Sequence, residues 1–495
     1  MQTLSTKPTN KLVYLTFMVI GGSYLWPWNC FLSAISYFYT RIYDDHLRSI
    51  LSSSLMTIST VTSTLVFLYL ADKQRYANYP RRIVYGEIIT AVVFLFLALS
   101  CFVTLSSDAV YFGFLLFAMF MATVGTSYTQ NGSIAVVSLY EPVYTQAVMV
   151  GQAFAGIVPP LGSILSALSY ETGDGTTADS TSTSDSPSEL DSSSSWAQWS
   201  SFVYFIIATV LSLSAVFLYI FSINKVKVLH EPDEGDYLRY QDELSDDQFE
   251  TADIIESQEE PAASSSEYTS FLGSPNSKPK NPKSSPPSSP ILAGGRPHLQ
   301  RSQTHPIAIV EDEEALVKGE HHTSVSLTKL SIKLRIPATT VFLVFAVTLA
   351  YPVFASTVQS NTFGIPAHIY IPVVFFVWNF GDLIGRVLCA FPFFIIKRDS
   401  YFLIYGIGRV LFIPFFLLFT MSKDRSDISY LLLHLLFGIT NGHLCSCAFI
   451  QFPNYLDDTE REAGGGFMTL ILSFGLTTGS LFSFVLSILV NSISK

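Results

Sequence analysis

Charged residues are scarce in this chain of 495 residues. Asp, Glu, Lys and Arg make up 14% of it, whereas about 25% is usual for a soluble protein. Hydrophobic residues contribute 49%, and phenylalanine alone occurs 40 times. This composition excludes an ordinary soluble domain and indicates a chain that lies mostly in a lipid bilayer. No basic patch is present, so nucleic acid is not an expected partner.

Cysteine is rare as well, and the sequence carries no pattern typical of catalysis. The five cysteines all lie in apolar runs, at positions 30, 101, 389, 445 and 447, which argues against a disulfide framework. Cys445 and Cys447 are too close together and too isolated to suggest a metal site, so neither a metal nor another cofactor is expected. There is no nucleophile elbow and no phosphate-binding loop, and an enzyme is not expected.

Long apolar runs are what the sequence has in abundance. A bilayer crossing takes about 20 apolar residues, and by that measure the sequence predicts an all-α integral membrane protein of eleven transmembrane helices. The expected spans are 12–38, 51–71, 83–105, 110–138, 144–169, 200–223, 338–358, 368–394, 401–420, 429–451 and 467–490.

A long polar segment over residues 225–335 separates six spans from five. It is rich in Ser, Pro, Asp and Glu, and it cannot bury enough apolar area to order itself. We therefore expect a six-helix bundle over 1–224, a disordered loop over 225–335 and a five-helix bundle over 336–495. The run Ser284–Pro290 in the loop looks phosphorylatable, which makes kinases or sorting factors candidate partners.

The distribution of Lys and Arg predicts the orientation. With a cytosolic N-terminus, fourteen of these residues lie in the short flanks on the cytosolic side, and five lie on the opposite side. Positive residues concentrate on the cytosolic side of membrane proteins. The C-terminus is then expected on the lumenal or extracellular side, as an odd number of spans requires.

The run 369–394 contains two opposite charges near its middle. An ionisable group at membrane depth costs roughly 2.5–3.5 kcal/mol, so the cost suggests a function. On a helix, Asn379, Asp382 and Arg386 fall within a ~60° sector, which predicts one polar stripe turned away from lipid. The stripe indicates a path for a polar substrate, whereas a purely structural ion pair between Asp382 and Arg386 is the alternative.

Two other spans offer polar or aromatic groups. In the first, Trp28 follows Pro27 and shares a face with Leu25, so its indole is placed to stack on a flat heterocycle or to pack against the partner bundle. In the fourth, Gln130 has both a donor and an acceptor, which suits the edge of a nucleobase. Hydrogen bonding between helices is the alternative there.

Three further ionisable residues lie within the expected spans. Glu87 and Arg409 are close enough to span ends to serve as anchoring or pairing residues. His443 titrates near neutrality and is a candidate proton carrier, with a hydrogen-bonded packing role as the alternative.

Several stretches together resemble the equilibrative nucleoside transporters. They are Pro27-Trp-Asn29, Gly151-Gln-Ala-Phe-Ala-Gly156, Phe376-Val-Trp-Asn-Phe-Gly-Asp-Leu-Ile-Gly-Arg386, Arg409-Val-Leu-Phe-Ile-Pro414 and Glu462-Ala-Gly-Gly465, and they follow the family's order. The resemblance implies a major-facilitator-like bundle of six plus five helices that moves nucleosides such as adenosine and uridine. The look is closest to fungal vacuolar members, so a vacuolar or other intracellular membrane is expected over the plasma membrane.

The resemblance also implies roles for individual residues. Leu25 and Trp28 would line a central cavity, and Gln130 would meet the base. Asp382 and Arg386 would meet the ribose and its surroundings. Two asparagines, Asn29 and Asn379, look like helix-positioning residues.

The leading hypothesis is facilitated diffusion of nucleosides, with nucleobases as further substrates, by alternating access. One alternative is proton-coupled nucleoside transport, in which Asp382 or His443 titrates. Another, from a different class, is a membrane receptor or scaffold that transports nothing, in which the polar stripe fixes helix packing and the segment 225–335 recruits partners.

Overall fold

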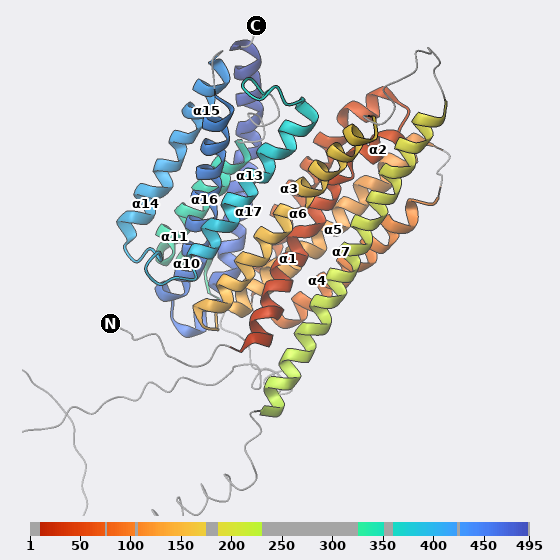
Figure 1. Cartoon of the computed structure of the whole chain (residues 1–495). Coiled ribbons are helices and arrows are strands. Elements are labelled where there is room, and N and C mark those ends of the chain that lie inside the picture. Colours follow the sequence, from red (N-terminus) through yellow and green to blue (C-terminus); the bar gives the residue numbers. More distant parts are fainter. Residues whose placement is uncertain are drawn as a thin grey trace, which may run out of the picture. The chain divides into compact units, whose positions relative to one another are not determined.

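The computed structural model describes residues 10–74, 77–103, 107–174, 187–229, 325–350, 360–422 and 426–493, and within these ranges all regular structure is helical. The N-terminal bundle comprises α1 (Lys11–Ser33), α2 (Ile35–Arg41), α3 (Asp45–Asp72), α4 (Tyr79–Ser100), α5 (Asp108–Val137), α6 (Pro142–Asp174) and α7 (Pro187–Leu229). The C-terminal bundle comprises α10 (Leu327–Lys333), α11 (Arg335–Ala350), α13 (Ala367–Leu388), α14 (Asp399–Gly408), η2 (Arg409–Leu411), α15 (Phe412–Met421), α16 (Asp427–Gln451), η3 (Phe452–Tyr455), η4 (Asp458–Glu460) and α17 (Arg461–Ile493). Figure 1 shows the first group in red to yellow-green and the second in green-blue to violet.

Most of the described helices can cross a bilayer. Nine spans qualify by length and apolar composition, with α14, η2 and α15 forming one of them, and α10 with α11 makes a tenth if this pair, bent by 88°, is one span. Helix α1, which continues through Pro27, is not among them. The all-α membrane architecture is confirmed, whereas the count of eleven stays a prediction.

Within each bundle, the helices pack closely in pairs. In the N-terminal bundle α1 packs on α6, and α5 packs on α3 and α4; in the C-terminal bundle α13 packs on α16, and α11 on α17. Small residues permit such close backbone approach. A Cβ added to Gly21 of α1 would lie 2.1 Å from the carbonyl oxygen of Val148 on α6, so only glycine fits there.

Two sets of helices join the bundles to each other. In the first, here called the α6–α13 contact, α6 packs against α13. In the second, here called the α17 contact, α17 packs against α3 and α5. The groups that meet across the α17 contact are neutral: Thr64 Oγ1 lies 2.8 Å from Ser473 Oγ and 2.9 Å from Thr477 Oγ1, and the Asn131 amide donates to Thr469. A charge lies directly behind them, because the buried guanidinium of Arg82 donates to the carbonyl oxygen of Asn131 at 2.6 Å.

Helix α10 begins before the expected end of the central loop. Its Leu330 is buried, and Lys329 and Lys333 form ion pairs of 2.5 and 2.6 Å with Glu460 at the start of the last helix. These contacts order residues that the sequence predicted to be part of the loop 225–335. The first residues of the expected loop, 225–229, belong to α7, and residues 230–324, including Ser284–Pro290, lie outside the described residues.

Candidate substrate site

The two charged residues of α13 form a buried ion pair. Arg386 Nε lies 2.7 Å from Asp382 Oδ2, one helical turn apart, as their spacing predicts. The Asp382 side chain and backbone together are 6% exposed, and Arg386 is 4% exposed. The polar stripe of α13 is therefore turned into the protein.

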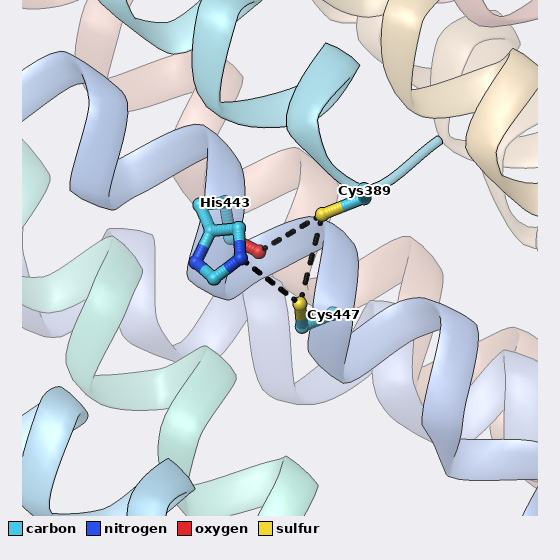
Figure 2. Close-up of side chains that lie close together, drawn as sticks. All are labelled: Cys389, His443 and Cys447. Atoms are coloured by element: carbon cyan, nitrogen blue, oxygen red, sulfur yellow. Dashed lines mark hydrogen bonds between the residues drawn. The ribbon is translucent and has the colours of Figure 1, made fainter. Parts of the chain in front are cut away.

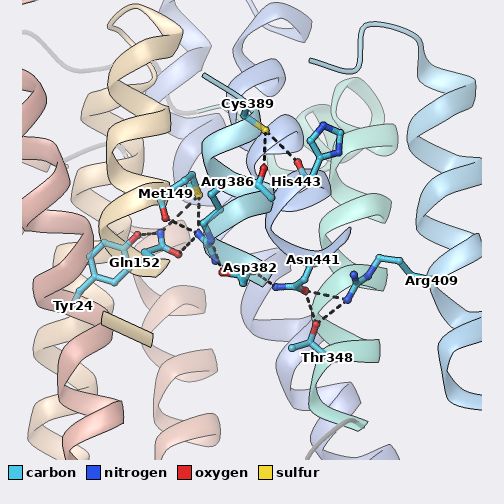
Figure 3. A network of polar contacts seen from close by, with 11 residues as sticks. Tyr24, Met149, Gln152, Thr348, Asp382, Arg386, Cys389, Arg409, Asn441 and His443 are labelled. Atoms are coloured by element: carbon cyan, nitrogen blue, oxygen red, sulfur yellow. Dashed lines mark hydrogen bonds and ion pairs between the residues drawn. The ribbon is translucent and has the colours of Figure 1, made fainter. Parts of the chain in front are cut away.

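Arg386 reaches beyond its own bundle to α6. Its Nη1 donates to the backbone carbonyl of Met149 and to Oε1 of Gln152, both at 3.0 Å. The Gln152 amide in turn donates to the hydroxyl of Tyr24 on α1. Figure 3 shows this chain running from α1 through α6 to the ion pair. One guanidinium thus connects both bundles.

Asp382 is held on its other side by α16. Its Oδ1 accepts a hydrogen bond of 2.6 Å from the amide of Asn441. The carbonyl oxygen of Asn441 accepts from Thr348 on α11 at 2.7 Å and from Arg409 Nη2 at 3.1 Å. Asn441 therefore links the carboxylate of Asp382 to a second guanidinium (Figure 3).

Arg409 lies at a break in its helix, and this break explains its position. Pro414 cannot donate the backbone hydrogen bond that a helix would direct to Val410, and residues 409–411 form a 3-10 turn between α14 and α15. Arg409 is 1% exposed and also donates to Thr440 Oγ1 at 2.6 Å. Of the two expectations for Arg409, anchoring at a span end was wrong, whereas its hydrogen bonds in the buried network agree with the pairing alternative.

Glycines bring α13 close enough to α16 for these contacts. A Cβ on Gly442 would lie 2.0 Å from the backbone oxygen of Asp382, and one on Gly385 would lie 2.2 Å from the oxygen of Ile439. Each of these backbone oxygens leaves no room for a side chain. Close packing of the two helices thus sets the short reach from Asn441 to Asp382.

The network holds two guanidinium groups and one carboxylate, so its side chains carry a net positive charge. Both oxygens of Asp382 accept hydrogen bonds. Among the described residues, Nη2 of Arg386 donates no hydrogen bond, which leaves a donor for an added ligand. Such a set can exchange its internal hydrogen bonds for those of a neutral ligand that carries hydroxyls and ring nitrogens.

The two asparagines lie on either side of one stretch of α6. Asn29 Nδ2 donates to the backbone oxygen of Ala155 at 2.9 Å. The carbonyl oxygen of Asn379 lies so close to Gly156 that a Cβ there would approach it to 2.5 Å. Both asparagines thus lie against the backbone of α6, and the helix-positioning role that the resemblance implies, with direct substrate contact as the alternative, stays a prediction.

The other expected contact residues are less closely joined to the ion pair. Leu25 and Trp28 are partly buried and pack against the core of the N-terminal bundle, with Leu25 next to Tyr24 in α1. The side chain of Gln130 is partly buried on α5 and makes no hydrogen bond within the described part of the chain. His443 faces the backbone oxygen of Phe394 at 2.7 Å, away from Asp382.

Several members of the network were not expected from the sequence, namely Tyr24, Met149, Gln152 and Thr348, and Asn441 was considered only as a companion of His443, not as a partner of Asp382. In the sequence Gln152 stands out only as part of the stretch Gly151–Gly156 that resembles the family, although an amide in an apolar span is itself a signal of a polar partner. Its partner Arg386 lies 234 residues further along the chain, and no sequence spacing reveals that distance.

Solved structures with this architecture are transporters of the major facilitator superfamily. The proton:xylose symporter XylE bound to 6-bromo-6-deoxy-D-glucose matches 97% of this chain and 89% of its own, with a TM-score of 0.52 and 10% identity. The human organic anion transporter MFSD10 matches 98% and 96%, with a TM-score of 0.51 and 11% identity. These likenesses confirm the expected fold class.

The sequence comparisons are more specific. A family model described as nucleoside transporter matches residues 116–488. Nucleoside transporter FUN26 of Saccharomyces cerevisiae is 31% identical over 99% of this chain and 88% of its own length, and human equilibrative nucleoside transporter 1 is 22% identical over 97% and 98%. The chain belongs to the nucleoside transporter family, which confirms the resemblance found in its motifs.

Proposed function

We propose that the protein moves nucleosides across a membrane by facilitated diffusion. Its family membership supports the substrate class. The single observation that carries the proposal is the bridge from Arg386 to Met149 and Gln152, because it places a charged group where the two bundles meet. In folds of this kind, substrates bind between the bundles, which then rock around them.

In this proposal the buried network supplies the polar contacts of the substrate. The carboxylate of Asp382 accepts a hydrogen bond from a ribose hydroxyl, and Arg386 donates its free Nη2 to a sugar oxygen or a ring nitrogen. Gln130 contacts the edge of the base, and Leu25 and Trp28 contact its face. Asn29 and Asn379 keep α1 and α13 in position against α6.

The location of the contacts suggests how access alternates. The α6–α13 contact involves the first half of α6 and the last half of α13. The α17 contact involves the first half of α17 and the last parts of α3 and α5. In an antiparallel bundle, the first ends of α6 and α17 and the last ends of α3, α5 and α13 all lie on one side of the membrane. This is the side that the Lys and Arg distribution marks as cytosolic. Closure on that side supports entry of the substrate from the other.

The decisive experiment is uptake of labelled adenosine or uridine by liposomes that contain the purified protein. Without an imposed proton gradient, we expect uptake that stops when the concentrations inside and outside are equal. Liposomes without protein give the background. Uptake that requires a proton gradient and disappears in His443→Ala would contradict the passive mechanism and favour proton coupling.

The loop, the orientation and the host membrane complete the proposal. We place the N-terminus in the cytosol and the C-terminus in the lumen of a vacuole or another intracellular compartment, supported by the Lys and Arg distribution and by the similarity to a fungal relative. The central loop would be a target of kinases or sorting factors. A chain that lacks residues 230–324 should still transport, whereas a scaffold would lose its function.

A further inference from the structure

Three side chains with metal-binding atoms meet at the end of α13. Cys389 caps the C-terminus of this helix, and His443 and Cys447 lie one turn apart on α16. Their ligand atoms lie within 4.8 Å of one another. Figure 2 shows the two sulfur atoms and the imidazole turned toward a common point.

The distances fit a tetrahedral ligand set. Zinc binds sulfur at about 2.3 Å and imidazole nitrogen at about 2.0–2.1 Å, so two sulfurs on one zinc ion lie about 3.8 Å apart, and a sulfur and a nitrogen about 3.6 Å. Here Cys389 Sγ lies 3.6 Å from Cys447 Sγ, and Cys447 Sγ lies 3.6 Å from His443 Nε2. The side chains need little adjustment to bind a metal ion.

We propose that Cys389, His443 and Cys447 form a zinc site that clamps the end of α13 to α16. Binding of Zn²⁺ releases one proton from each thiol, and the complex of one Zn²⁺, two thiolates and one neutral imidazole carries no net charge. This neutrality suits a site where both cysteines are buried. Thiolate and imidazole together are typical zinc ligands.

The surroundings provide a fourth position and a route of entry. The backbone oxygen of Phe394 lies 2.7 Å from His443 Nε2 and 3.8 Å from Cys447 Sγ. In the metal-free state, Nε2 donates its proton to this oxygen. In the zinc-bound state the metal takes the place of this proton, the remaining ring proton sits on Nδ1, and the Phe394 oxygen shifts off the Nε2 axis to reach the fourth position of the zinc ion. His443 is only half-buried, so the site is open to ions from that side.

The clamp would act on the helices that carry the ion pair. Cys389 follows Arg386 by three residues, and His443 follows Asn441 by two (Figure 3). Zinc would therefore fix the register of α13 and α16 that holds Asn441 against Asp382. Metal content and transport are separate readouts, so failure of the zinc site leaves the proposed transport function standing.

The test measures metal in the full-length protein, purified in detergent with a phosphine reductant that keeps the thiols reduced. After addition of Zn²⁺ and removal of the excess, we expect about one zinc ion per chain by elemental analysis. Cys389→Ser and Cys447→Ser should lose this zinc. The matched control is Cys445→Ser, because Cys445 is equally buried on α16 but is not part of the cluster; it should keep the zinc.

A second probe keeps the test independent of folding defects. Replacement of zinc by Co²⁺ in the wild-type protein should give the d–d absorption of a tetrahedral ion and a sulfur-to-cobalt charge-transfer band. Two results would overturn the proposal: zinc content in Cys447→Ser equal to that of the wild type, or Co²⁺ spectra without sulfur ligation.

Discussion

The α6–α13 contact and the α17 contact join the same two bundles, yet they are built from different groups. The first rests on Arg386, a buried charge that donates to Met149 and Gln152 while it pairs with Asp382. The second rests on hydroxyls and one amide, with Thr64 between two partners on α17. Neutral hydrogen bonds between membrane helices contribute about 0.6 kcal/mol each on average, so they can form and break easily. In the α17 contact the buried guanidinium of Arg82 donates to Asn131 within the N-terminal bundle. Of the two contacts, as far as the structure describes them, only the α6–α13 contact has a charged side chain that donates from one bundle to the other.

The variant with the largest expected effect on the α6–α13 contact is Arg386→Gln. It removes the bridge and leaves Asp382 without its cation, and breaking a buried ion pair costs about 3–5 kcal/mol. If about 3 kcal/mol of this is lost from the substrate-bound state, uptake falls roughly 100-fold. Liposome uptake per folded protein measures the effect. Uptake within a few-fold of the wild type would show that the guanidinium has only a packing role.

A smaller effect is expected for Gln152→Ala, which removes one of the hydrogen bonds from Arg386 to α6 but keeps the bond to the Met149 carbonyl and the ion pair. A hydrogen bond to a charged group contributes about 1.5–3 kcal/mol, so uptake should fall at least roughly tenfold. The matched variant is Gln152→Glu, which still presents an oxygen to Arg386. Equal uptake by both variants would mean that this hydrogen bond is not needed.

The smallest effect is expected in the α17 contact. Thr64→Val keeps the shape of the side chain and removes two hydroxyl contacts, so the loss of stability should stay near 1 kcal/mol. We expect uptake within about twofold of the wild type, with a small fall in melting temperature. A loss as large as that of Gln152→Ala would remove the distinction between the two contacts.

How much of this could be predicted from the sequence depends on the distance between partners. The ion pair between Asp382 and Arg386, which the sequence offered as the alternative to a substrate path, could be found because the two residues lie one turn apart in a single helix. The partners of Arg386 on α6 could not be found this way, since they depend on which helices pack together. The architecture and the family followed from apolar runs and short motifs, which need no long-range information.

For two other residues, tertiary contacts alter an interpretation that was based on their neighbours in the sequence. Arg409 was expected to anchor or to pair near a span end, and it lies in the buried network, at the 3-10 turn that precedes Pro414. Cys447 was not expected to bind a metal, because only its neighbour Cys445 was considered as a second ligand. In the structure Cys447 contacts Cys389, 58 residues away in the sequence. In both cases the deciding contacts come from another helix.

The most direct test of the account compares two buried carboxylates on neighbouring helices. Asp382 lies in the network. Asp427 lies at the start of α16 and accepts hydrogen bonds from the Ser360 hydroxyl and from the backbone N–H groups of residues 361–363, which precede α13. Uptake of labelled uridine should be measured for Asp382→Asn and Asp427→Asn, each normalised to the amount of folded protein. We expect at least a roughly tenfold loss for Asp382→Asn and little change per folded molecule for Asp427→Asn. Full uptake by Asp382→Asn would contradict a substrate role for the network.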